Sequence, residues 1–215
     1  FDYATNTLIA VPEDMPAPGE PGFANATADT LIEIARASCG RVLVLFTSIS
    51  ALDNARKAIT SVLSQSGIRV IAQGSDGSPA RIMRMLADDQ PTIALGTSSL
   101  WEGVDLHGAS LDVLVMTKLP FPVPTDPVVA ARSELHEDGF NEYIVPEAVQ
   151  RFRQGFGRLI RSKSDRGVFV ILDKRIVTKR YGVIFQKSLP KCTVRRLARE
   201  RLNQLLISWR DGTLT

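Results

Sequence analysis

The residues best suited to chemistry lie in the segment QGFGRLIR, at positions 154–161. Gln154, Gly157, Arg158 and Arg161 form the pattern QxxGRxxR. On a helix, two arginines three positions apart would share one face, and two permanently charged, forked guanidinium groups suit a polyphosphate. Gln154 could donate to a phosphate oxygen or position a water molecule, and Gly157 permits close approach of a ligand or another backbone. A solvated basic helix face with an incidental glycine is the alternative interpretation.

A second candidate segment, GTSSLWEGVDLHG at residues 96–108, directly follows an apolar run. Thr97 and Ser98 could offer hydroxyl and backbone N–H groups to a phosphodiester. Glu102 and Asp105 could accept from a ribose hydroxyl or hold the arginines of the first segment. Ser, Gly and Asp are also common in ordinary capped turns, which is the alternative here.

Two weaker segments lie where other apolar runs end. FTS at residues 46–48 closes one run, and QGSDGSPAR at residues 73–81 follows the next. Hydroxyl groups, glycines and a helix start are features of places where anions bind. Either segment alone is uninformative.

Alternating strands and helices must position these segments. Short runs of Val, Leu and Ile, typical of strands buried on both faces, lie at 41–48, 68–72, 92–96, 111–116 and 167–173. Helical spacing and start signals predict helices at 26–38, 50–63, 79–88 and 142–156, and a further helix that begins at 126. The last predicted helix, at 193–209, is basic and amphipathic. This alternation predicts an α/β fold with a mainly parallel sheet and helices on both faces.

In such sheets, ligands bind beyond the carboxyl ends of the strands. We therefore expect the site in the loops at 47–50, 73–78, 96–108, 117–126 and 173–180. Residues 11–22 contain four prolines and two glycines and predict an extended surface connector that is neither helix nor central strand.

The composition excludes several classes of protein. No apolar run approaches the roughly 20 residues that span a bilayer, and 44% hydrophobic residues argue against disorder throughout. Cys39 and Cys192 are too few for a disulfide scaffold or a zinc site and favour a cytoplasmic location. His107 and His136 lack any partner pattern. The chain begins with Phe1 and not with Met, so we expect a processed protein or a piece of a longer one. No charged region precedes an apolar core at the start, so we expect no signal peptide.

Charge is distributed very unevenly along the chain, although the net charge is only +3. Residues 1–149 hold 9 basic and 19 acidic side chains, whereas residues 150–215 hold 17 basic and 4 acidic ones. Such asymmetry indicates contact with nucleic acid or a membrane surface. For the basic stretch at 150–201, two interpretations remain open: a nucleic-acid face, or a surface that balances the acidic half or meets an acidic partner domain.

Taken in order, the segments resemble motifs IV, IVa, V and VI of superfamily 2 helicases. The resemblance rests on VLFTS, QG followed by Arg81, GTSSLWEGVDL and QRFRQGFGRLIRSKSDRGVFVILDKR. WEGVD, LPFPVPTDP at 119–127 and GRLIRSKSDRG narrow it to the DinG branch of the DinG/XPD family of ATP-dependent DNA helicases. Those enzymes have two RecA-like motor domains that clamp ATP. The resemblance implies a RecA-like second motor domain here, with residues 1–23 as a lead-in from the first and 24–215 as the domain itself.

The resemblance also implies roles for individual residues. Arg158 and Arg161 would be arginine fingers for the γ-phosphate, with Gln154 beside them as a third catalytic residue. Glu102, Gly103, Asp105 and Gly157 would lie near ATP, and Thr47, Ser48, Gly74, Thr97 and Ser98 would line a track for single-stranded DNA. Movement along that strand would be 5′ to 3′.

Half of the expected ATP site is missing from this sequence. It contains no GK[ST] phosphate-binding loop, so the resemblance assigns most of the ATP–Mg²⁺ contacts, and any four-cysteine iron–sulfur cluster, to a first motor domain outside it. That domain and single-stranded DNA are the expected partners; a membrane is not. We expect no metal site in these residues and no ATP hydrolysis by the chain alone. The alternative function is a non-catalytic DNA-binding or interaction module that keeps a helicase fold.

Overall fold

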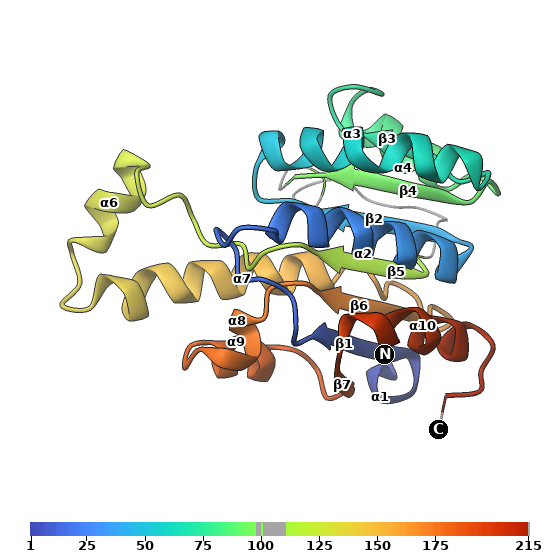
Figure 1. Cartoon of the computed structure of the whole chain (residues 1–215). Coiled ribbons are helices and arrows are strands. Elements are labelled where there is room, and N and C mark those ends of the chain that lie inside the picture. The colour runs from blue at the N-terminus through green and yellow to red at the C-terminus, as the bar shows by residue number, and fades with distance from the viewer. Residues whose placement is uncertain (98–99, 101–110, 215) are drawn as a thin grey trace.

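In the described part of the chain, seven short strands build one sheet in which every neighbouring pair is parallel (Figure 1). The computed structural model describes residues 1–97, 100 and 111–214. In spatial order the strands are β3 (Arg69–Ala72), β4 (Thr92–Gly96), β2 (Arg41–Leu45), β5 (Val113–Met116), β6 (Gly167–Ile171), β1 (Thr7–Pro12) and β7 (Thr193–Leu197). The strands β4, β5 and β6 are buried along their whole length, as their continuous apolar runs predict.

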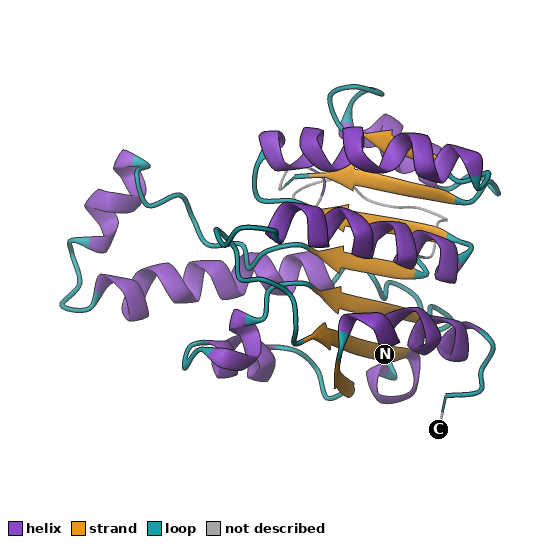
Figure 2. Cartoon of the chain, in the orientation of Figure 1, coloured by secondary structure: helices purple, strands orange, loops and turns teal. Residues whose placement is uncertain are grey.

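Helices cover both faces of the sheet, which confirms the predicted three-layer fold (Figure 2). One face carries α2 (Phe23–Ser38), α3 (Ile49–Gln65) and α10 (Leu202–Arg210). The other carries α4 (Pro79–Leu86), α7 (Val145–Phe156), α8 (Arg175–Thr178) and α9 (Gly182–Ser188). Shorter elements are α1 (Tyr3–Asn6), α6 (Pro127–Ser133), a π-helical turn (Phe140–Ile144) and a 3₁₀ turn (Arg199–Arg201). No described helix is long and apolar enough to cross a membrane.

Side-chain caps fix where several helices begin. The hydroxyl of Ser78 accepts from the N–H of Arg81, and the carboxylate of Asp126 accepts from the N–H of Val128. Both predicted starts, each a capping residue followed by proline, are therefore confirmed. The cap of α3 is Ser48 instead of Ser50, because the Ser48 hydroxyl accepts from the N–H of Ala51 at 3.3 Å.

The connector predicted at residues 11–22 was wrong for its first two residues, Val11 and Pro12, which belong to the strand β1. Residues 7–12 form β1, which lies between β6 and β7 and is buried at every position. Pro12 is tolerated because it occupies the carboxyl end of the strand. The pairing of β1 with β6 already ends at Ala10, so Pro12 lies beyond it. The connector begins only after Pro12.

The predicted basic helix at 193–209 was wrong for its first half. Thr193–Leu197 is the edge strand β7, paired with β1, and the helix α10 starts only at Leu202. Arg195 and Arg196 therefore lie on an exposed strand and not on the helix that carries Leu202, Leu205 and Leu206. Charged residues on an edge strand discourage pairing with another chain.

Candidate functional site

The predicted site residues lie at two opposite edges of the sheet. Thr47, Gly74 and Thr97 follow the carboxyl ends of β2, β3 and β4. The helix α7 runs back across the sheet, and the turn that follows it leads into the start of β6. There the N–H of Val168 donates to the carbonyl of Asp112, which lies just before the start of β5. The arginine segment is therefore at the amino edge. The loops predicted to hold the site at the carboxyl edge therefore do not include this segment, because it enters a strand instead of leaving one.

The spacing predicted that the two arginines would share a helix face, but both lie in a turn beyond the end of α7. The helix ends at Phe156, and the N–H of Arg158 donates to the Gly155 carbonyl at 3.0 Å. Leu159 and Ile160, between the arginines, are buried in the core. This anchor fixes the turn while Arg158 and Arg161 stay partly exposed.

Asp165 organises the second half of this arginine turn. One carboxylate oxygen accepts from the N–H of Arg161 at 2.7 Å and the N–H of Ser162 at 2.9 Å, and the other accepts from the Ser162 hydroxyl at 2.6 Å. Burial opposes ionisation of Asp165, but these hydrogen bonds outweigh it and lower its pKa. The sequence analysis missed this residue, although Ser and Asp in SKSDRG are typical of such turns.

The fold of this domain does not require a glycine at position 157. Gly157 has an ordinary helical φ of −61° and is exposed. A Cβ there would meet only the carbonyl oxygens of Arg153 and Gln154, both at 3.5 Å, which is normal contact. Gly167 differs, since a Cβ there would lie 2.9 Å from the Leu111 carbonyl oxygen. If a glycine is required at position 157, the requirement comes from a ligand, another domain or residues outside the described part of the chain.

A groove opens at the carboxyl edge between the first turns of α2 and α3. Its volume is about 300 Å³, and its lining includes Thr47, Ser48, Asn54, Thr117 and Lys118. The structure thus brings two predicted DNA-binding residues together with Thr117 and Lys118, which the sequence analysis did not single out. The available signal was their position directly after the predicted strand at 111–116.

The other two described DNA-binding candidates, Gly74 and Thr97, follow the carboxyl ends of β3 and β4. The side-chain oxygen of Gln73 accepts from the N–H of Thr97 at 3.0 Å and from its hydroxyl at 3.3 Å. Gly74 has a φ of +88°, a backbone conformation that favours glycine. The hydrogen bonds from Thr97 to Gln73 therefore link the carboxyl ends of β4 and β3, and Gly74 shapes the turn that follows β3. Ser98, Glu102, Gly103 and Asp105 lie outside the described residues.

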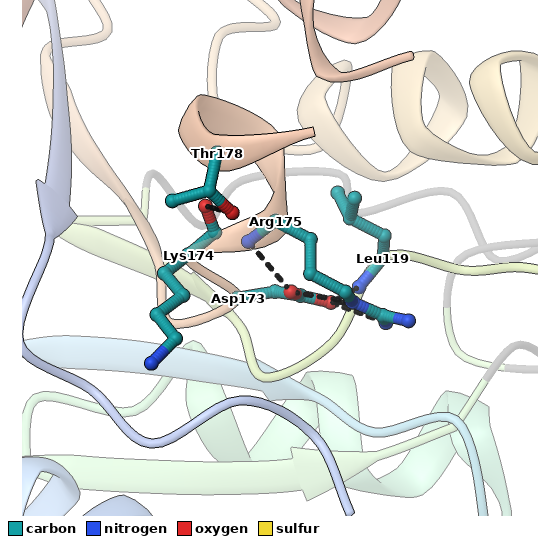
Figure 3. Close-up of polar contacts among 5 residues, drawn as sticks. All are labelled: Leu119, Asp173, Lys174, Arg175 and Thr178. Carbon is teal, nitrogen blue, oxygen red and sulfur yellow. Dashed lines mark hydrogen bonds and ion pairs between the residues drawn. The ribbon is translucent and has the colours of Figure 1, made fainter. Parts of the chain in front are cut away.

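A buried ion pair ties the carboxyl end of β6 to the loop after β5 (Figure 3). The Asp173 carboxylate accepts from the N–H of Leu119 at 2.9 Å, and from Nε and Nη2 of Arg175 at 2.9 and 2.6 Å. Asp173 is fully buried, whereas the Arg175 side chain is 26% exposed and lies over the ring of Phe121. The hydrogen bonds to Asp173 raise the pKa of the Arg175 guanidinium. Within the described residues, no group of three or more His, Cys, Asp or Glu side chains could hold a metal ion.

Comparisons with known proteins support the family that the sequence motifs resemble. The family model described as "Helicase C-terminal domain" matches residues 31–192. The chain is 37% identical over 210 residues to the 3'-5' exonuclease DinG of Bacillus subtilis, covering 94% of this chain and 23% of that protein. It is 36% identical over 194 residues to the ATP-dependent DNA helicase YoaA of Haemophilus influenzae, covering 88% of this chain and 30% of that protein. The chain thus spans less than a third of these relatives.

The fold also matches a solved helicase. A structure of the XPD helicase superimposes with a TM-score of 0.69 at 20% identity, covering 89% of this chain and 36% of that one. At this identity the match supports the RecA-like fold alone.

Proposed function

The chain belongs to the helicase C-terminal domain family, as a DinG-like member of the DinG/XPD group, and from this premise we propose that it is the second motor domain of an ATP-dependent DNA helicase. The observation that carries the proposal is the anchored arginine turn at the amino edge. It presents Arg158 and Arg161 on a support held by buried residues, and no phosphate-binding loop occurs in the sequence.

At the amino edge, we assign Arg158 and Arg161 to the γ-phosphate of an ATP molecule that a first motor domain holds. Guanidinium groups stabilise the charge that develops on the transferred phosphoryl group, which is worth about 10³–10⁵ in rate in related enzymes. Gln154, exposed on the last turn of α7, would contact the same phosphate. The resemblance adds Glu102, Gly103 and Asp105 near the nucleotide, and Gly157 leaves room for its approach.

At the carboxyl edge, we assign Thr47, Ser48, Gly74, Thr97 and Ser98 to the backbone of single-stranded DNA. The ends of β2, β3 and β4 are adjacent in the sheet, which supports assigning the described members of this set to one ligand. Hydroxyl and backbone N–H groups contact phosphates without reading sequence, which suits a protein that moves along DNA.

The separation of the two edges supports a mechanism of coupling. ATP would bridge the two motor domains, and its hydrolysis would release them. The sheet and α7 lie between the two edges as packed, buried structure, so the domain would move as one body. If the grip on DNA differs between closed and open states, each cycle becomes a step along the strand, 5′ to 3′ by resemblance.

The test is ATP hydrolysis by the full-length protein with saturating single-stranded DNA. We expect Arg158→Ala and Arg161→Ala each to lower kcat by about 10³-fold or more and to leave the Kd for DNA within about twofold. Arg153→Ala is the matched control, because Arg153 is an exposed arginine on the last turn of α7. Normal turnover in both arginine variants would refute the assignment.

The 215-residue chain alone provides a second test. We expect it to hydrolyse no ATP, because half of the site is absent. DNA-stimulated hydrolysis by the chain alone would contradict the proposal. DNA binding by the full-length protein without any ATP hydrolysis would favour the alternative of a non-catalytic module.

A further inference from the structure

Lys118 lies in the groove between α2 and α3 and is the one charged side chain among its described lining residues. No described carboxylate lines this groove, although residues 1–149 carry ten more acidic than basic side chains. The polar groups beside Lys118 are hydroxyls and amides, including those of Thr47, Ser48 and Asn54. The groove is thus locally positive within the acidic half of the sequence, which suits an anion.

The backbone on both sides of Lys118 is held in place. The N–H and the hydroxyl of Thr117 both donate to the Leu45 carbonyl, at 3.1 and 3.0 Å, which ties this residue to the end of β2. The N–H of Leu119 donates to the buried carboxylate of Asp173, which Arg175 holds in turn (Figure 3). Lys118 is therefore presented from a fixed position, and the loop need not be ordered when a ligand binds.

The ammonium group of Lys118 keeps donors available. It lies 5.4 Å from the centroid of the Phe23 ring. A cation–π contact at a partly exposed site is worth only about 0.5–1 kcal/mol and uses none of the three N–H donors. This contact orients the side chain across the groove without neutralising it.

We propose that Lys118 binds a backbone phosphate of single-stranded DNA, in the groove that also contains Thr47 and Ser48. The proposal rests on the proposed function, which assigns DNA to this edge of the sheet. A phosphodiester fits because the groove offers one cation, several hydroxyl donors and no described carboxylate. The apolar floor, with Phe46 and Ala55, can accommodate the uncharged part of a nucleotide.

The test compares Lys118→Ala, Lys118→Arg and the parent sequence in the full-length protein without nucleotide. Fluorescence anisotropy with a labelled oligothymidylate gives the Kd at several salt concentrations. We expect Lys118→Ala to raise the Kd about tenfold and to reduce the slope of log K against log salt by about 0.7, as loss of one phosphate contact predicts for a single strand. Lys118→Arg keeps the charge and should restore both values to within about threefold.

Arg84→Ala is the matched control, since it removes one exposed positive charge from α4 on the other face of the sheet. Thermal unfolding of each variant shows whether the fold is retained. If the parent protein binds DNA but Lys118→Ala matches Arg84→Ala in Kd and salt slope, the Lys118 assignment is overturned and the proposed function stands. If the parent protein does not bind single-stranded DNA, both are overturned.

Discussion

Replacing Arg175 by methionine tests how much the buried ion pair at the end of β6 contributes to stability. The substitution keeps most of the side-chain volume over Phe121 but removes the three side-chain hydrogen bonds to Asp173. Among the described residues, the Asp173 carboxylate, which has no exposed surface, would keep only the N–H groups of Leu119 and residue 175 as donors. Removing one partner of a buried pair costs about 3–5 kcal/mol, and we expect about 3 kcal/mol because these two donors remain.

This loss is measurable in the 215-residue chain. A change of about 3 kcal/mol corresponds to a fall in Tm of roughly 6–12 °C for a domain of this size. Urea unfolding should give the same loss of free energy with an unchanged slope. The control is Arg151→Met, which breaks a partly exposed pair with Glu147 one turn away on α7 and should cost less than about 0.5 kcal/mol. Equal effects of the two substitutions would refute the claim that burial makes the Asp173 pair important.

Two further predictions concern the arginine turn. Gly157→Ala should leave the free energy of unfolding unchanged or raise it by up to about 1 kcal/mol, since position 157 is unstrained and uncrowded. The same variant should lower ATP hydrolysis by the full-length protein. Normal hydrolysis by this variant would show that no ligand or domain approaches position 157. Asp165→Ala should lower kcat about tenfold without changing the Kd for DNA, because Asp165 holds the backbone of Arg161. Because folding lowers the pKa of Asp165, its contribution to stability is present at neutral pH and is lost as the pH falls through the lowered pKa, so unfolding curves of variant and parent should begin to converge only below about pH 4.

Local sequence signals predicted the centre of the sheet and most helix starts. The runs at 41–48, 92–96 and 167–173 became buried strands because a continuous Val and Leu run can be satisfied only between two helical layers. Ser78 and Asp126 began helices as predicted because a cap acts on N–H groups only two or three residues away.

The errors concern features decided by distant parts of the chain. Leucines at 197, 202, 205 and 206 favoured one helix, yet 193–197 is a strand because it pairs with β1, nearly the whole chain away. The connector predicted over 11–22 includes Val11 and Pro12, which belong to β1, although the strand's neighbour, β6, begins at residue 167.

The same limitation applies to the candidate site. Motif order allowed the arginines and the carboxyl-edge residues to be named from sequence. Their placement at opposite edges follows from the direction in which α7 crosses the sheet. Asp173 could be read as the end of a strand, but its contact with the N–H of Leu119 spans 54 positions and no local pattern indicates it. Asp165 was closer to prediction, since the hydrogen-bond partners of its carboxylate, Arg161 and Ser162, lie within four residues of it.

The central claim is that one edge of this domain serves ATP and the opposite edge serves DNA. The most direct test measures kcat for ATP hydrolysis at saturating DNA and the Kd for single-stranded DNA in the same full-length preparations of Arg161→Ala and Lys118→Ala. The account predicts that Arg161→Ala lowers kcat by about 10³-fold with little change in Kd, and that Lys118→Ala raises the Kd about tenfold with kcat at saturating DNA within about threefold of the parent. If both variants lower kcat and weaken DNA binding to similar extents, the separation of the two edges is contradicted.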